Sequence, residues 1–422
     1  MAEALSDPTG TFQARSLLAV FGATFFVRFA FGITLAVFAS YITGKLTGLS
    51  GGDEGTVGLV AAMAPTGEFT TVLLSGLATD RVGRFPVLFS GMVGAAILFA
   101  AVALTRNVVL LGALNFFFGI SSGAILASSL AVVADRSPLD ARGLEMGRFD
   151  AMNLAGWLGG FAFGIAILGL IQDGRLSIPF LRLVFVIGAA TLLGGLAFAW
   201  YLVRRVPRPG PVRGSPISVI LRTAFSRSVL LVTLPWLVVY VLIGYVLVFV
   251  GTATASVNFP DVYIAAAIGA GGAVLVVSQP RFGRLADRYG RTRMMNLGVG
   301  GFVGVMLFAS LAIAYGPLVE LLVPLGICVV AALGYGPAAL AALADLSRAL
   351  SRGTTMAIYS LTISLGMILG LVVGTQLVAA FGEDGYFLFF GGVAAALVVL
   401  TALRYWDVRT TEASPIPTTP VR

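Results

Sequence analysis

Apolar runs of about 20 residues follow one another along nearly the whole chain. A run of this length, folded as a helix, is long enough to cross a hydrocarbon core about 30 Å thick. Hydrophobic residues make up 58% of the 422 residues and charged residues only 11%, whereas soluble domains carry about 25% charged residues. We therefore expect an all-α, multi-pass integral membrane protein with the lipid bilayer around it.

Hydropathy predicts twelve transmembrane helices, and the longest polar interruption lies between the sixth and the seventh. This interruption, residues 204–228, is rich in Pro and Arg. We expect an N-terminal six-helix half (1–203), a basic linker (204–228), a C-terminal six-helix half (229–406) and a tail (407–422). The predicted spans are 16–42, 56–79, 85–105, 107–134, 144–171, 178–203, 229–257, 262–282, 294–315, 318–344, 354–381 and 385–406.

The distribution of basic residues predicts the orientation in the membrane. An even number of spans puts both termini on one side, and most arginines fall in the loops on that side. Short loops with an excess of Lys and Arg remain cytoplasmic. We expect both termini to be cytoplasmic in a cell membrane. The net charge of +8 is explained in this way, and no nucleic-acid partner is expected because the arginines do not gather on one face.

Residue types that are absent exclude several kinds of chemistry. The chain has no histidine and one cysteine, Cys328, so it lacks an intrachain disulfide and the commonest transition-metal ligand. It also lacks a GxxxxGK[ST] phosphate loop and a nucleophile triad. We expect no enzyme activity, no metal and no cofactor, and any proton chemistry must use carboxylates.

Three short patterns occur once in each half, at offsets of about 207 to 210 residues. A duplicated six-helix unit explains this spacing. The glycine ladders would let helices slide at the boundary between the halves or would simply allow tight packing. The pairs are GLATDRVGR (76–84) with GRLADRYGR (283–291), ADRSPLDARG (134–143) with ADLSRALSRG (344–353), and the ladder Gly156, Gly160, Gly164 with Gly366, Gly370, Gly374.

Two six-helix halves that each carry GxxxDRxGR after the second helix resemble the major facilitator superfamily. The resemblance covers nearly the whole chain and implies two pseudo-symmetric halves that rock against each other. It also implies that contacts of the two loops close the cytoplasmic side, since an acid there can meet an arginine or a helix N-terminus. The residues assigned to gating are Gly76, Asp80, Arg81, Gly83, Arg84, Gly283, Asp287, Arg288, Gly290 and Arg291.

The same resemblance implies that spans one, four, seven and ten line a central cavity. Polar and aromatic residues on these spans are candidates for contact with a solute, and hydrogen bonding between helices is the alternative. Asp150 is a candidate second protonatable site, or a structural partner of Arg148, Arg142 or a loop backbone. The other candidates are Asn115, Ser122, Tyr245 and Tyr335, joined on span five by Asn153 and Trp157.

Two charges of opposite sign are predicted at similar depth in the membrane. Arg28 lies 13 residues from Arg15, and Glu68 lies 12 residues before Asp80, or roughly 20 Å and 18 Å from the same side at 1.5 Å per residue. Charged groups inside a membrane usually face a cavity or pair with each other. We expect Arg28 and Glu68 to interact directly or through one water or polar side chain, either as a static pair or with Glu68 as a protonation switch.

These features favour a secondary active transporter that moves a small organic solute by alternating access, with a proton or Na⁺ as coupling ion, and that acts as a monomer. Proton-coupled export of an amphipathic compound and proton-coupled uptake of an organic acid or other metabolite are both open. Asn115 stands where many drug–proton antiporters of the family carry an arginine. A non-transporting membrane sensor with the same fold is the alternative from another class.

Overall fold

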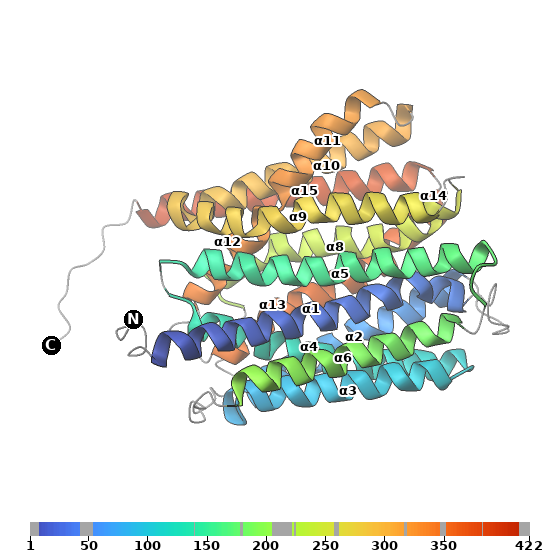
Figure 1. Ribbon diagram of the computed structural model, residues 1–422. Coiled ribbons are helices and arrows are strands. Elements are labelled where there is room, and N and C mark those ends of the chain that lie inside the picture. Colours follow the sequence, from blue (N-terminus) through green and yellow to red (C-terminus); the bar gives the residue numbers. More distant parts are fainter. Residues whose placement is uncertain are drawn as a thin grey trace.

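The computed structural model describes residues 8–42, 54–138, 140–177, 180–204, 222, 225–256, 261–315, 319–346, 352–381 and 383–412. Regular structure within these ranges is helical throughout (Figure 1). This confirms the all-α fold. Most of the linker predicted at 204–228 and part of the tail predicted at 407–422 lie outside the described residues. The boundaries of both segments therefore stay predictions.

The first half contains six long helices, and the second half contains the same six spans with two of them interrupted. The first six are α1 (Pro8–Ile42), α2 (Glu54–Arg81), α3 (Arg84–Leu104), α4 (Val108–Arg136), α5 (Arg142–Gln172) and α6 (Phe180–Val203). The second half has α8 (Arg227–Ser256), α9 (Asp261–Tyr289), α10 (Arg291–Tyr315), α11 (Val319–Ala332), α12 (Tyr335–Leu346), α13 (Arg352–Leu369), η3 (Gly370–Gly374), α14 (Thr375–Phe381) and α15 (Glu383–Glu412).

Spans ten and eleven are not continuous α-helices in the structure. Span ten is divided into α11 and α12 at Leu333 and Gly334. Pro337 follows in the first turn of α12 and has no N–H with which to continue the hydrogen bonds of α11. Span eleven contains a π-helical turn, η3, bounded by Gly370 and Gly374, and such turns are inserted into otherwise α-helical segments.

The helices have the length and surface of membrane spans. Of the described residues, nine helices are long and apolar enough to cross a membrane. Large apolar side chains such as Leu74, Ile97 and Leu403 are exposed on the outside of the bundle, which would be unfavourable in water but suits lipid.

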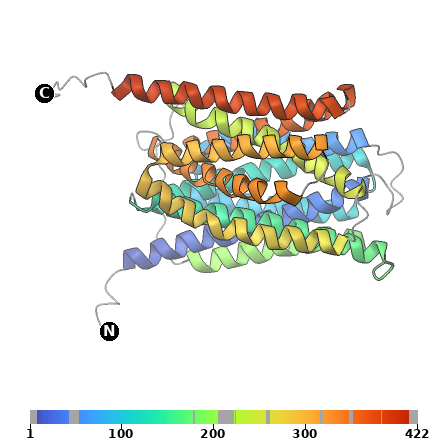
Figure 2. The ribbon, with the colours of Figure 1, turned by 90° about the horizontal axis from the view of Figure 1, so that it is seen from above.

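The most extensive packing between the halves involves two helix pairs. Helix α5 packs along α9, as Figure 1 shows, and α2 packs against α13. Helix α1 begins and α15 ends at the same end of the bundle (Figures 1 and 2). We call this end the terminal end. It also holds the α4–α5 connection, because the Gln13 amide donates a hydrogen bond to the carbonyl oxygen of Arg136.

The two glycine ladders pack within their own halves. The ladder on α5 faces α1, and a Cβ on Gly160 would collide with the carbonyl oxygen of Phe29. The ladder on α13 and η3 faces α8, where a Cβ on Gly366 would lie 2.6 Å from the carbonyl oxygen of Leu237. The ladders therefore serve tight packing inside each half, and the alternative of sliding between the halves does not fit their position.

Gly160→Ala should destabilise the fold, because a methyl group at this position forces α1 and α5 apart and overpacking costs about 1–3 kcal/mol. Gly194→Ala is the matched control: a Cβ at Gly194 has no atom within 4 Å, and alanine favours a helix. Thermal unfolding can be followed with a thiol-reactive fluorophore on Cys328, the single cysteine. We expect a lower midpoint for Gly160→Ala only, and equal midpoints in the two variants would contradict the packing role.

Candidate functional site

Two tight turns connect α2 to α3 and α9 to α10. Gly83 has φ 115° and Gly290 has φ 94°, a region that residues with a Cβ rarely adopt. Each turn brings an acid to the arginine four residues later. Asp80 Oδ1 lies 3.5 Å from Arg84 Nη2. In the second copy, Asp287 Oδ1 lies 3.3 Å from Arg291 Nη1. The repeated sequence thus forms the same ion pair in both halves.

A second acid completes each copy of this cluster. Arg84 Nε lies 3.0 Å from Asp135 Oδ2 at the end of α4, and Arg291 Nε lies 2.7 Å from Asp345 Oδ2 at the end of α12. The gating motif assigns no role to Asp135 or Asp345. Their signal in the sequence is the Ala-Asp pair that opens the second repeated pattern in both halves.

The second-half copy also binds the start of α5 in the first half. Asp287 Oδ1 accepts a hydrogen bond of 2.9 Å from the backbone N–H of Gly143, and its Oδ2 accepts one of 3.0 Å from that of Leu144. The N-cap residue of α5, Ala141, makes no side-chain hydrogen bond. The carboxylate of Asp287 therefore supplies the cap, and its charge is favourable at the positive end of the helix.

An ion pair reinforces this connection between the halves. Arg142 Nη1 lies 2.8 Å from Asp345 Oδ1, and the Arg142 side chain is only 2% exposed. Asp345 also binds Arg291, so one carboxylate contacts an arginine from each half. We call the contacts of Arg142, Gly143 and Leu144 with Asp287 and Asp345 the latch.

Glycines let the backbones meet at the latch. A Cβ on Gly143 would lie 2.6 Å from the carbonyl oxygen of Gly283, and one on Gly283 would collide with the carbonyl oxygen of Gly143. One turn further on, a Cβ on Gly147 would lie 2.6 Å from the carbonyl oxygen of Gln279. The terminal end of the bundle is therefore closed in this structure.

The remaining residues assigned to gating lie around the turns. Gly76 is buried in α2 and Arg81 is exposed at its end. Arg288 is also exposed, and its guanidinium carbon lies 5.3 Å from the centre of the Tyr289 ring. Their part in gating stays a prediction.

Glu68 lies at the interface of the halves, deeper in the bundle. This carboxyl group is buried, and the Ser360 hydroxyl on α13 donates a hydrogen bond to its Oε1. The hydroxyls of Ser122 on α4 and Ser364 on α13 are also within hydrogen-bonding reach, and Arg28 on α1 interacts with it electrostatically. Four helices from both halves thus contribute to one polar cluster, which we call the Glu68 cluster.

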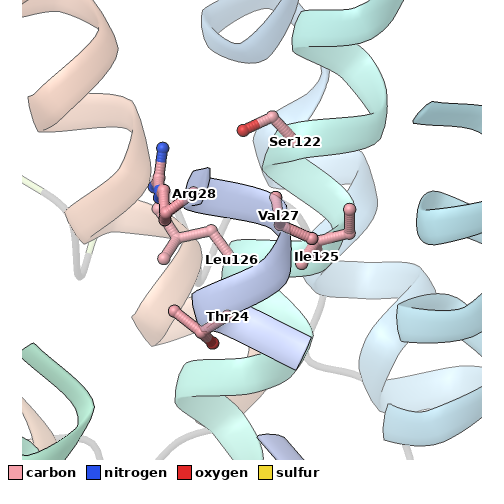
Figure 3. Close-up of a pocket in the computed structure, with 6 residues that line it drawn as sticks. All are labelled: Thr24, Val27, Arg28, Ser122, Ile125 and Leu126. Atoms are coloured by element: carbon pink, nitrogen blue, oxygen red, sulfur yellow. The ribbon is translucent and has the colours of Figure 1, made fainter. Parts of the chain in front are cut away.

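Arg28 and Ser122 face a small cavity between α1 and α4 (Figure 3). Its volume is about 10 Å³, close to the minimum that holds one water molecule. Thr24, Val27, Ile125 and Leu126 complete the lining. Ser122 belongs to both the lining of this cavity and the Glu68 cluster, and a connection from Arg28 to Glu68 through one polar side chain stays a prediction.

Other candidates from the sequence do not gather at this cavity in the present structure. The Asn115 amide donates a hydrogen bond of 2.7 Å to the carbonyl oxygen of Val60, which joins α4 to α2 within the first half. The Tyr245 ring packs against Phe389 on α15, with ring centroids 4.4 Å apart. Asn115 and Tyr245 therefore make packing contacts within one half in this state.

Three further candidates lie on α5 and α12. The Tyr335 hydroxyl donates a hydrogen bond of 3.0 Å to the carbonyl oxygen of Val232, and its ring stacks on Trp236. Trp157 stacks on Phe161. Asn153 Oδ1 is buried and has no hydrogen bond within the described part of the chain.

Asp150 is buried on α5 against the second half. A Cβ on Gly336 of α12 would lie 2.7 Å from Asp150 Oδ2 and 3.2 Å from Trp236 Cη2. The structural partners proposed from the sequence are engaged elsewhere: Arg148 Nη1 lies 2.6 Å from Glu145 Oε1, and Arg142 belongs to the latch.

The central contacts of Ser360, Trp236 and Tyr359 have no signature in the sequence. A serine in an apolar helix is common, and Ser360 meets Glu68 only because 292 residues of chain fold back on themselves. The duplication does offer one indirect signal. Helix α2 is equivalent to α9 and α13 is equivalent to α5, so contact between α5 and α9 predicts contact between α13 and α2.

Comparison with known proteins agrees with this architecture. The sequence matches the Major Facilitator Superfamily over residues 20–336 and 257–421. A multi-drug resistance efflux pump PmrA homolog of Lactococcus lactis subsp. lactis (strain IL1403) is 24% identical over 380 residues, which cover 86% of this chain and 88% of the relative.

Two solved structures share the fold. The human organic anion transporter MFSD10 (TETRAN) has a TM-score of 0.67 at 19% identity, with 92% of this chain and 99% of that chain covered. The proton:xylose symporter XylE bound to 6-bromo-6-deoxy-D-glucose has a TM-score of 0.68 at 17% identity, with 94% and 96% covered. With a family match that spans nearly the whole chain, the protein belongs to the Major Facilitator Superfamily of membrane transporters.

Proposed function

We propose that this transporter exports a small amphipathic organic compound from the cell in exchange for protons. The observation that carries the proposal is the Glu68 cluster, in which a buried carboxyl group of the first half accepts a hydrogen bond from Ser360 of the second half. A proton on this group changes both its charge and its hydrogen bonding at the interface that must open and close.

The chemistry of the cluster suits a switch. A carboxylate in an apolar interior is unfavourable unless it is paired and hydrogen-bonded. Arg28 and three hydroxyl groups supply these partners when the halves are together. If the halves separate, Ser360 and Ser364 leave with α13, and protonation then removes the charge of a carboxylate that has lost two of its hydroxyl partners. The coupling ion is therefore a proton in this proposal, rather than Na⁺.

The latch supplies the gate. We place the terminal end on the cytoplasmic side, because the basic loops at this end fit the positive-inside rule. The structure then corresponds to a state closed towards the cytoplasm. Opening this side breaks the contacts of Asp287 and Asp345 with the start of α5, while the ladder glycines hold α5 to α1.

Export is favoured by the relative described as a multi-drug resistance efflux pump, although identity to it is only 24%. Uptake of an organic acid is the second candidate, and its support is Arg28 in the lining of the small cavity between α1 and α4. Transport of fluorescent cationic, neutral and anionic amphipathic compounds into liposomes with an imposed pH gradient separates the two. If the pH gradient changes the transport of none of these compounds, proton-driven transport is contradicted.

Glu68→Gln should abolish proton-driven accumulation and preserve exchange of substrate, because glutamine keeps the hydrogen bond to Ser360 but cannot release a proton. The measurement compares gradient-driven uptake with counterflow in the same liposomes. Glu320→Gln, at an exposed acid in the first turn of α11, is the control and should behave as wild type. Normal gradient-driven accumulation by Glu68→Gln would rule out the switch.

Asp287→Asn should favour the state that is open at the terminal end, because it removes the negative charge at the start of α5. A loss of about 1–2 kcal/mol changes the ratio of two states about 5- to 30-fold. Spin labels at exposed Val82 and Arg284, in a Cys328→Ser background, report the distance between the halves. The control is Asp173→Asn at the other end of α5. A distance distribution unchanged by Asp287→Asn would remove Asp287 from the gate.

A further inference from the structure

Asp150 is a buried acid that the Glu68 cluster and the latch leave out. It is 8% exposed, and it has neither an ion pair nor a hydrogen bond to any residue that the structure describes. The two arginines nearest in sequence are paired with Glu145 and Asp345. A buried carboxylate without a partner is unfavourable, so this position is suited to a positive group that comes from outside the chain.

Aromatic residues of the second half lie near this acid. Trp236 on α8 stacks on Tyr359 of α13, with ring centroids 5.9 Å apart, and meets Tyr240 edge to face at 5.3 Å. Tyr240 and Tyr359 both interact electrostatically with Asp150, and their hydroxyls lie within hydrogen-bonding reach of each other. The face of an aromatic ring attracts cations, and rings grouped around one point recognise quaternary ammonium ions.

Of the three charged side chains that act on Tyr240, Asp150 is the one without a partner of opposite charge within the described ranges. Arg28 and Glu68 also act on Tyr240, and they offset each other. Among the residues that the structure describes, those of α8, α12 and α13 found near Asp150 are Trp236, Tyr240, Tyr359 and Gly336, and none of these carries a formal positive charge.

We infer that Asp150, Trp236, Tyr240 and Tyr359 form a binding site for the cationic group of an amphipathic organic cation. This inference rests on the proposed export function and names its substrate class. The carboxylate binds the charge, and the three rings contact the apolar groups attached to it. The hydroxyls of Tyr240 and Tyr359 interact with each other, and in this proposal the rings contact the ligand.

The position of Asp150 fits loading from the terminal end. It lies eight residues after Arg142 on α5, or about 12 Å along the helix. The latch therefore covers the site in the present structure, and Gly336 of α12 lies against the carboxyl group. When the latch opens, a cation entering from this end passes Glu145, which is already paired with Arg148, before it reaches Asp150.

Shape-matched hydrophobic ions provide the test. Tetraphenylphosphonium and tetraphenylborate have similar size and opposite charge, so a carboxylate site should bind only the first. Binding of each radiolabelled ion is measured to the full-length protein in lipid nanodiscs, with empty nanodiscs subtracted. We expect Asp150→Asn to weaken tetraphenylphosphonium binding at least tenfold and Asp150→Glu to remain within about threefold of wild type.

Control variants distinguish loss of the Asp150 charge or of the Tyr359 ring from a general loss of folded protein. Glu145→Gln changes another buried acid on α5, one already paired with Arg148, and should bind normally. Tyr359→Phe keeps the ring and should also bind, whereas Tyr359→Leu should lose about tenfold. If Asp150→Asn does not give monodisperse protein, the comparison of Tyr359→Phe with Tyr359→Leu tests the site instead. Equal tetraphenylphosphonium binding by these two variants would then overturn it.

The outcomes for the site and for the transport function are distinct. Equal tetraphenylphosphonium binding by wild type and Asp150→Asn overturns the site and leaves proton-driven export standing. Binding that depends on Asp150, without any response of transport to a pH gradient, supports the site and overturns proton-driven export. Preference for tetraphenylborate overturns the cation site and favours the anion uptake that Arg28 suggests.

Discussion

The start of α5 is capped by a carboxylate from the other half of the protein, and this interaction joins the two halves at the terminal end. The first N–H groups of any helix lack partners within the helix. In α5 the N-cap residue is Ala141, which cannot supply one, and Asp287 accepts from Gly143 and Leu144 instead. When the halves separate, water can accept hydrogen bonds from these N–H groups in place of the carboxylate. Breaking the contact therefore leaves no N–H group without a partner, and its free-energy cost is small.

Helix α5 connects this cap to the rest of the site. Along a single helix the chain carries Arg142 and Gly143 at the latch, Asp150 two turns further in, and Gly156 next to Arg28. A Cβ on Gly156 would lie 2.9 Å from the Cβ of Arg28, so α5 and α1 cannot separate easily. Under the proposed gating, we expect a movement that releases the cap to move Asp150 and Arg28 together, because α5 packs tightly on α1.

Much of this architecture can be predicted from the sequence, because length and hydropathy determine the spans and the duplication determines their arrangement. The turns at Gly83 and Gly290 follow from the need for positive φ. The break of span ten at Gly334 depends on how Pro337 meets the preceding turn, which hydropathy does not report. The surroundings of Tyr245 depend on how α8 is rotated, and the sequence of a helix that is apolar on all sides does not define this rotation.

The duplication also explains why the two buried acids have different surroundings. The offset of 210 residues that aligns the glycine ladders places Asp150 at the position equivalent to Ser360. Gly156 packs on the Cβ of Arg28, and its counterpart Gly366 packs in the same way on the Cβ of Tyr240. Arginine and tyrosine therefore occupy equivalent places in the two halves.

This divergence gives the two interfaces different chemistry. Where the first half has Arg28, the acid of that interface, Glu68, has a positive partner inside the protein and hydroxyl donors around it. Where the second half has Tyr240, the acid Asp150 meets an aromatic ring in place of a guanidinium. The first acid is balanced by the protein itself, so a proton is the natural species to change its state. The second acid lacks a balancing charge, and an organic cation can supply it.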